Sequence, residues 1–107
     1  MRTNWNKLVK SIPTKIKAGP NKGEYENLLI NDFHGQDTYG ETRFHPKQIV
    51  LRSDLKPKLM METFWHEFCH AISEEHNVGL TEQQILDLES AFPYFRQFFQ
   101  KLEGTNE

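Results

Sequence analysis

Cysteine and long apolar runs are both scarce in this chain of 107 residues. The single cysteine, Cys69, excludes an internal disulfide and a CxxC metal or redox site. No apolar run approaches the roughly 18 residues of a membrane-spanning helix, and no apolar stretch follows the charged N-terminus. We therefore expect neither a membrane span nor a secretory signal, and we expect a reducing, cytoplasmic location. The length predicts one small globular domain over residues 1–107.

Acidic residues are missing from the first 23 positions, which hold six of the 13 Lys and Arg residues. This stretch carries a formal charge of +6, whereas the rest of the chain carries −8. A basic segment of this kind can contact nucleic acid or an acidic partner. Its cations are not adjacent, however, and no aromatic residues alternate with them. Nucleic-acid binding is therefore disfavoured, and a solvated face is the simpler interpretation.

Glycine and proline divide the first half of the chain into segments that are too short for helices but suit strands. Strands are predicted over residues 14–18, 25–31, 42–45 and 48–52, and a short helix over residues 4–10. Residues 37–40 have turn composition, with Gly40 expected to supply a positive φ. The first half should therefore form a small antiparallel or mixed sheet.

The second half has helical periodicity. Residues 59–76 follow Pro57 without another helix breaker, and apolar residues recur every three or four positions from Met61 to Ile72. This pattern predicts one long and largely buried helix. The fold class is therefore α+β, with a small N-terminal sheet packed on this long helix and on a C-terminal helical segment.

A second helix is predicted after a short connection. Thr81 and Gln84 have the spacing of a capping box, which would open that helix. Its expected core-facing residues are Ile85, Leu88 and Phe92. Pro93 should kink or restart the helix, because its ring removes a backbone donor.

The long helix contains the pattern H-E-x-x-H in residues 66–70, HEFCH. A spacing of four places the imidazoles of His66 and His70 on one helix face, where they can occupy two positions of a tetrahedral zinc ion. Glu67 is adjacent and can act as general base toward a water that the metal activates. Burying two imidazoles and a carboxylate on one helix face costs free energy unless something binds them. The sequence therefore predicts Zn²⁺ as cofactor and Glu67 as the catalytic residue.

A third protein ligand must come from elsewhere in the chain. Glu89 lies on the second helix, which must fold back on the first because the connection is short. It would complete a His-His-Glu set with a fourth position left for water. Glu82 and His76 remain alternatives, although Ser73 stands where a metzincin pattern has the glycine that lets the chain turn back. The predicted metal ligands are His66, His70 and Glu89.

The residues around this pattern resemble a known group of proteins. Residues 63–72 (TFWHEFCHAI), followed by residues 79–82 (GLTE) and 88–89 (LE), are similar to small gluzincin-type metallopeptidase-like proteins of phages and other mobile elements. Those proteins are related in pattern to the ImmA/IrrE group. The resemblance covers roughly residues 39–92. It implies a few-stranded sheet on two or three helices, a zinc ion held by His66, His70 and a downstream acid, and Glu67 as base.

These features predict a zinc-dependent hydrolase, most simply a metallopeptidase that acts on a protein or peptide. Its substrate would pair with an edge strand near residues 48–52. Candidates for stabilising the oxyanion are Tyr39, Arg43, His76 and Tyr94. The alternative is a catalytically silent, zinc-containing interaction module. It would bind a protein partner through the basic N-terminal stretch or through an apolar C-terminal face, made of Phe92, Phe95, Phe98 and Phe99.

Overall fold

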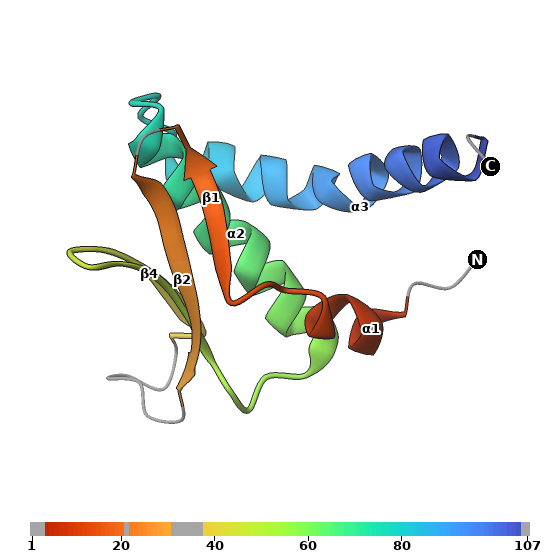
Figure 1. The fold of residues 1–107 in the computed structure, drawn as a ribbon, viewed down its shortest axis with the longest axis horizontal. Coiled ribbons are helices and arrows are strands. Elements are labelled where there is room, and N and C mark those ends of the chain that lie inside the picture. The colour runs from red at the N-terminus through yellow and green to blue at the C-terminus, as the bar shows by residue number, and fades with distance from the viewer. Residues whose placement is uncertain (1–3, 21, 31–37, 106–107) are drawn as a thin grey trace.

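The structure is a computed structural model that describes residues 4–20, 22–30 and 38–105, with the side chains of residue 96 and residues 98–105 outside the description. It contains a four-stranded sheet and three helices, so the predicted α+β fold is confirmed (Figure 1). Residues 31 and 37, which belong to a predicted strand and a predicted turn, lie outside the described residues. No helix within the described residues is long and apolar enough to cross a membrane.

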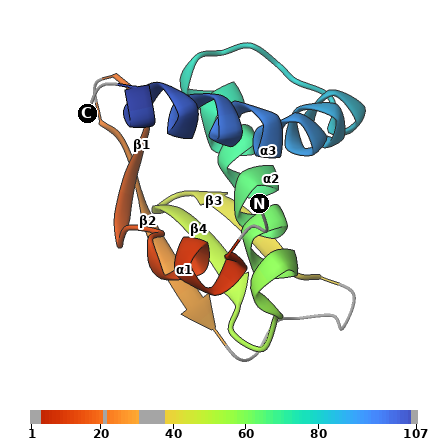
Figure 2. The same cartoon turned by 90° about the vertical axis from the view of Figure 1, so that its right-hand side faces the viewer.

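The elements follow the predicted order, with bounds within two residues of those expected. They are α1 (Trp5–Lys10), β1 (Lys15–Gly19), β2 (Gly23–Ile30), β3 (Gly40–Phe44), β4 (Lys47–Arg52), α2 (Pro57–Glu75) and α3 (Glu82–Thr105). The helix α2 crosses one face of the sheet, with α1 beside it and α3 packed against it (Figure 2). This arrangement buries one core between sheet and helices, made of Ala18, Tyr25, Ile49, Leu51, Met60, Met61, Phe64 and Ala71.

The sheet is mixed, with the strand order β1-β2-β4-β3. The central pair, β2 and β4, is parallel, and each outer pair is antiparallel. Because β4 is paired on both sides, the prediction that residues 48–52 form an edge strand is wrong. The edge strand β3 contacts α2 at Glu67, through Thr42.

The predicted capping box opens α3. The backbone N–H of Gln84 donates to Thr81 Oγ1 at 3.2 Å, and the backbone N–H of Thr81 donates to Gln84 Oε1 at 2.9 Å. The helix then continues through Pro93 to Thr105 as one element. Thr81 therefore caps the N-terminus of α3, and the helix begins at Glu82.

The face that α3 turns toward α2 is narrower than predicted. Ile85 is fully buried, and Phe92 packs edge-on against Trp65 with ring centroids 5.4 Å apart. Leu88 is 37% exposed, so the prediction that it faces the core is wrong. The contact stripe runs through Ile85, Glu89 and Phe92, at spacings of four and three, and Leu88 lies beside it.

The connection between α2 and α3 is held by Ser73. Its hydroxyl accepts a hydrogen bond from the backbone N–H of Leu80 at 2.8 Å, and its carbonyl accepts one from Val78 at 3.0 Å. Gly79 has a φ of 70°, and a Cβ there would have open space around it, so glycine serves the backbone conformation. The chain can therefore reverse direction and bring the start of α3 back to α2.

Gly40 does not have the positive φ that the turn prediction assigned to it. It is the first residue of β3, and a Cβ at this position would lie 2.8 Å from Thr63 Cγ2 and 3.0 Å from the carbonyl oxygen of Val50. The prediction of a positive φ is therefore wrong. Glycine suits this position for another reason, which is the close approach of β3 to Thr63 of α2.

Candidate metal centre

The two histidines of α2 lie side by side. The ring centroids of His66 and His70 are 5.0 Å apart, as expected for residues one helical turn apart on one face. Both side chains are partly accessible, with 19% and 29% of their surface exposed. Their Nε2 atoms both face the first residue of α3, Glu82.

Glu82 joins the two imidazoles into one donor group. Its Oε1 lies 2.7 Å from Nε2 of His70, and its Oε2 lies 3.2 Å from Nε2 of His66. One donor atom from each of these three residues lies within 4.8 Å of the others, so the group could hold a metal ion. Glu82 is 65% exposed, so the group opens to solvent on this side.

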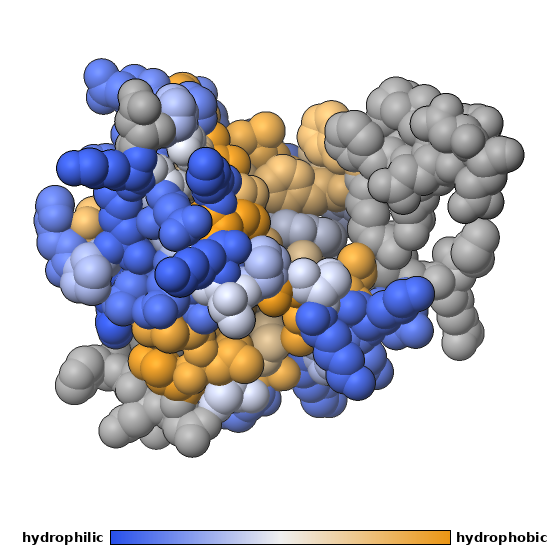
Figure 3. Space-filling view, viewed as in Figure 1, coloured by the Kyte–Doolittle hydropathy of each residue, from blue (hydrophilic) through white to orange (hydrophobic). Residues whose placement is uncertain are grey.

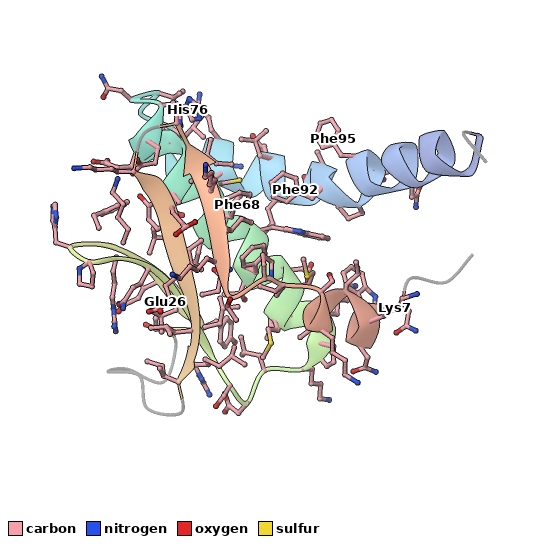
Figure 4. All side chains as sticks on the ribbon, viewed as in Figure 1. Lys7, Glu26, Phe68, His76, Phe92 and Phe95 are labelled. Carbon is pink, nitrogen blue, oxygen red and sulfur yellow. The ribbon has the colours of Figure 1, made fainter. Side chains whose placement is uncertain are left out.

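Glu89, which the sequence favoured as third ligand, lies on the other side of His66. Its Oε2 is 3.3 Å from Nδ1, the ring nitrogen that does not face Glu82. The structure thus brings Glu82 to the two Nε2 atoms and Glu89 to the back of one ring. His76 stands at the end of α2, beside the end of β1 (Figure 4), and is not among the three residues of this group.

The carboxyl group of Glu67 lies on the sheet side of the same helix. The residue is 8% exposed, and burial raises the pKa of its carboxyl group above the ordinary value, against the opposing effects of a hydrogen bond from Thr42 and of the neighbouring histidines. The hydroxyl of Thr42, on β3, lies 2.9 Å from Glu67 Oε1 and 2.8 Å from the Glu67 carbonyl oxygen. No sequence motif marks Thr42, because 25 residues separate it from its partner.

Three carboxyl groups surround the two imidazoles, from Glu67, Glu82 and Glu89. Among the described residues, no Lys or Arg forms an ion pair with any of the three. A cation placed between the imidazoles would offset this negative charge. The charge balance is therefore compatible with a metal site.

We call His66, His70 and Glu82 the metal-site group. A cavity of about 390 Å³ lies beside its His66, between the start of β3 and the helices α2 and α3. Its lining consists of Thr38, Tyr39, Gly40, Leu59, Thr63, His66, Glu67, Leu86 and Glu89. Among the candidates for oxyanion stabilisation, Tyr39 lines this cavity, whereas Tyr94 is 73% exposed and Arg43 pairs with Glu41. The cavity therefore reaches Glu67 and one of the two imidazoles, that of His66, whereas His70 and Glu82 do not line it.

Cys69 lies between the histidines in sequence but has no place in this group. It is 3% exposed, and burial raises the pKa of its thiol to about 11. The thiol is therefore protonated near neutral pH, and Cys69 is a buried core residue.

The chain matches no family model, no curated protein and no solved structure.

Proposed function

We propose that this protein is a zinc-dependent hydrolase and, more specifically, a small metallopeptidase. The observation that carries the proposal is the buried carboxyl group of Glu67 beside the donor group of His66, His70 and Glu82. A structural metal site requires its ligands and no adjacent base. A buried carboxyl group held next to the ligands is what general-base catalysis requires.

The donor group fits zinc. Two imidazole nitrogens and one carboxylate oxygen are a known ligand set for catalytic zinc, and three protein ligands leave a fourth position for water or substrate. A zinc ion held there would supply a Lewis acid for the substrate carbonyl and would lower the pKa of a bound water molecule.

Glu82 is proposed as the third ligand, and Glu89 is proposed to orient His66. A ligating histidine usually donates its second ring N–H to a carboxylate or carbonyl, which fixes its tautomer. Oε2 of Glu89 lies 3.3 Å from Nδ1 of His66, so Nδ1–H can donate to Glu89 while Nε2 faces the cation. In this proposal Glu82 binds the metal next to Nε2 of His66, and Glu89 orients the same ring through Nδ1.

Glu67 would move the proton in the reaction. Its carboxylate accepts a proton from water while the water oxygen bonds to the carbonyl carbon of the peptide. The same proton then passes to the leaving nitrogen as the carbon–nitrogen bond breaks, which restores the carboxylate. A carboxyl group whose pKa is raised by burial holds this proton more readily than an ordinary one.

A peptide substrate can pair with the edge strand β3. The carbonyl of Tyr39 accepts a hydrogen bond from the backbone N–H of Arg52, which sets the alternation along the β3–β4 ladder. The backbone groups of Gly40, Thr42 and Phe44 therefore point away from β4, toward the side of β3 where no described strand pairs. An extended peptide added there would run past the cavity and the metal-site group.

The direct test compares the wild type with Glu67→Gln, each loaded with zinc, on labelled casein and on a pooled library of quenched-fluorescence peptides. We expect equal zinc content and a loss of at least about 100-fold in hydrolysis for Glu67→Gln. Glu62→Gln, also on α2, is the matched control and should cleave like the wild type. Absence of cleavage by the wild type on both substrates would refute the hydrolase.

The second candidate is a catalytically silent, zinc-containing interaction module. The exposure of two aromatic residues on α3 favours it, since Tyr94 is 73% and Phe95 is 52% exposed. On the face shown in Figure 3, apolar side chains gather between α2 and the first half of α3. Phe98 and Phe99 lie outside the described side chains.

The basic N-terminal stretch offers this module less support. Lys15 lies directly opposite Glu26, and Lys17 opposite Glu24, in the β1–β2 ladder. These acids offset part of the positive charge on that edge. The module would be favoured if the wild type binds zinc and cleaves nothing, while a protein partner binds the wild type but not Phe95→Ser.

A further inference from the structure

The contact between β3 and the base of the proposed reaction involves one hydroxyl group. Thr42 Oγ1 lies 2.9 Å from Oε1 of Glu67 and 2.8 Å from the main-chain oxygen of Glu67. Within the described part of the chain, this hydroxyl is the only hydrogen-bond donor to the carboxyl group. The second oxygen, Oε2, makes no hydrogen bond to a described residue.

We propose that Thr42 is the positioning residue for Glu67. Its hydroxyl holds Oε1 and leaves Oε2 as the oxygen that takes the proton from water. The inference rests on the proposed hydrolase function, because the carboxylate is held for that proton transfer. In this role Thr42 would act through Glu67 and would contact neither the water nor the peptide carbonyl.

A glutamate side chain needs such a donor at this position. Glu67 is nearly excluded from solvent, so little water is available to solvate Oε1. Without the Thr42 hydroxyl, the carboxyl group would lose its donor and could turn to other rotamers, away from the metal-site group.

The second contact of the hydroxyl makes the placement more specific. The one hydroxyl hydrogen of Thr42 is shared between the Glu67 carbonyl oxygen at 2.8 Å and Oε1 at 2.9 Å, as a three-centre hydrogen bond that ties the side chain of Glu67 to its own backbone. The backbone N–H and C=O of Thr42 point toward the edge of β3 that no described strand occupies, where a peptide would pair. One residue therefore sets the position of the base relative to the substrate strand.

The substitution Thr42→Val removes the hydroxyl and keeps a β-branched side chain of similar size. Thr42 lies opposite the fully buried Ile49 on β4, where valine suits a strand well. Thr42→Ser keeps the hydroxyl and serves as the conservative rescue. Thr42→Ala replaces the valine variant if that variant does not fold.

The experiment measures steady-state hydrolysis of labelled casein and of the pooled quenched-fluorescence peptides by each zinc-loaded variant. For Thr42→Val we expect kcat to fall at least about tenfold, with KM and zinc content unchanged. Thr42→Ser should stay within about threefold of the wild type. Equal kcat for Thr42→Val and the wild type would overturn the proposal.

Crystal structures of the same variants supply a readout that does not depend on activity. We expect the Glu67 carboxyl group to leave its position in Thr42→Val and to keep it in Thr42→Ser. An unmoved carboxyl group in Thr42→Val would overturn the positioning role. If the wild type cleaves neither substrate, the hydrolase proposal fails, and the crystal structures alone decide whether Thr42 holds the carboxyl group.

Discussion

Glu89 and Glu82 contact opposite nitrogens of the same imidazole. Oε2 of Glu89 lies 3.3 Å from Nδ1 of His66, whereas Oε2 of Glu82 lies 3.2 Å from Nε2. Only Glu82 also reaches His70, at 2.7 Å from Nε2. The two carboxylates should therefore contribute unequally to metal affinity.

Replacing each carboxylate with its amide separates these roles. For Glu89→Gln we expect a loss of about 10-fold to 100-fold in zinc affinity, as is typical when the partner of a ligating histidine is lost. Glu82→Gln should lose more, because a metal ligand itself is removed. Competition titrations against a chelator at fixed pH give both constants.

Asp87→Asn is the control for these titrations, because it removes a negative charge from the same helix at an exposed site away from the histidines. Its zinc affinity should equal that of the wild type. If Glu89→Gln lost more affinity than Glu82→Gln, Glu89 would be the third ligand, as the sequence pattern predicted.

A second polar cluster joins the end of α2 to the sheet. The buried Tyr25 donates its hydroxyl hydrogen to Oε2 of Glu75 at 2.7 Å. Lys47 donates to Oε1 of the same carboxylate at 2.8 Å. Because Tyr25 is fully buried, Tyr25→Phe should reduce the free energy of unfolding by about 1–3 kcal/mol.

Urea unfolding measures this loss for Tyr25→Phe. Tyr94→Phe, which removes a hydroxyl from a side chain that is 73% exposed, should unfold like the wild type. Equal stability of Tyr25→Phe and the wild type would show that the bond to Glu75 adds nothing net to the fold.

The same cluster predicts a pH dependence. Hydrogen bonds from Lys47 and then Tyr25 hold the pKa of the Glu75 carboxyl group below its ordinary value of 4.5. A pKa that is lower in the folded state than in the unfolded state adds stability above the unfolded value. That stability is lost as the pH falls through the folded value.

The wild type should therefore be more stable than Glu75→Gln at neutral pH. The difference between their free energies of unfolding should shrink as the pH falls below about 4.5. Denaturant unfolding of both proteins from about pH 7 to about pH 3 measures it. A difference that stayed constant over this range would contradict the assignment of the pKa shift to folding.

Several features that depend on neighbours in sequence were predictable, although the φ of Gly40 and the burial of Leu88 were not. The capping box of Thr81 and Gln84, the shared face of His66 and His70, and the strand at β4 all follow from spacing within a few residues. Each of these features is set by local geometry that the residue types themselves determine. The structure has each of them.

Features that depend on packing between distant segments were not predictable. The parallel pairing of β2 with β4 makes β4 internal, and no local pattern in β4 reports it. Likewise, the contact of Thr42 with Glu67 needs β3 to lie against α2. The choice between Glu82 and Glu89 depends on where α3 crosses α2 and on how each side chain is turned.

The most direct test of a metal centre at His66 and His70 is elemental analysis of protein purified without added metal. We expect about one zinc ion per chain in the wild type and in His76→Ala, whose histidine is not among the three residues of the metal-site group. His66→Ala and His70→Ala should each purify with little or no zinc while remaining folded. Equal zinc occupancy in the wild type and His66→Ala would contradict the assignment of the metal centre to these residues.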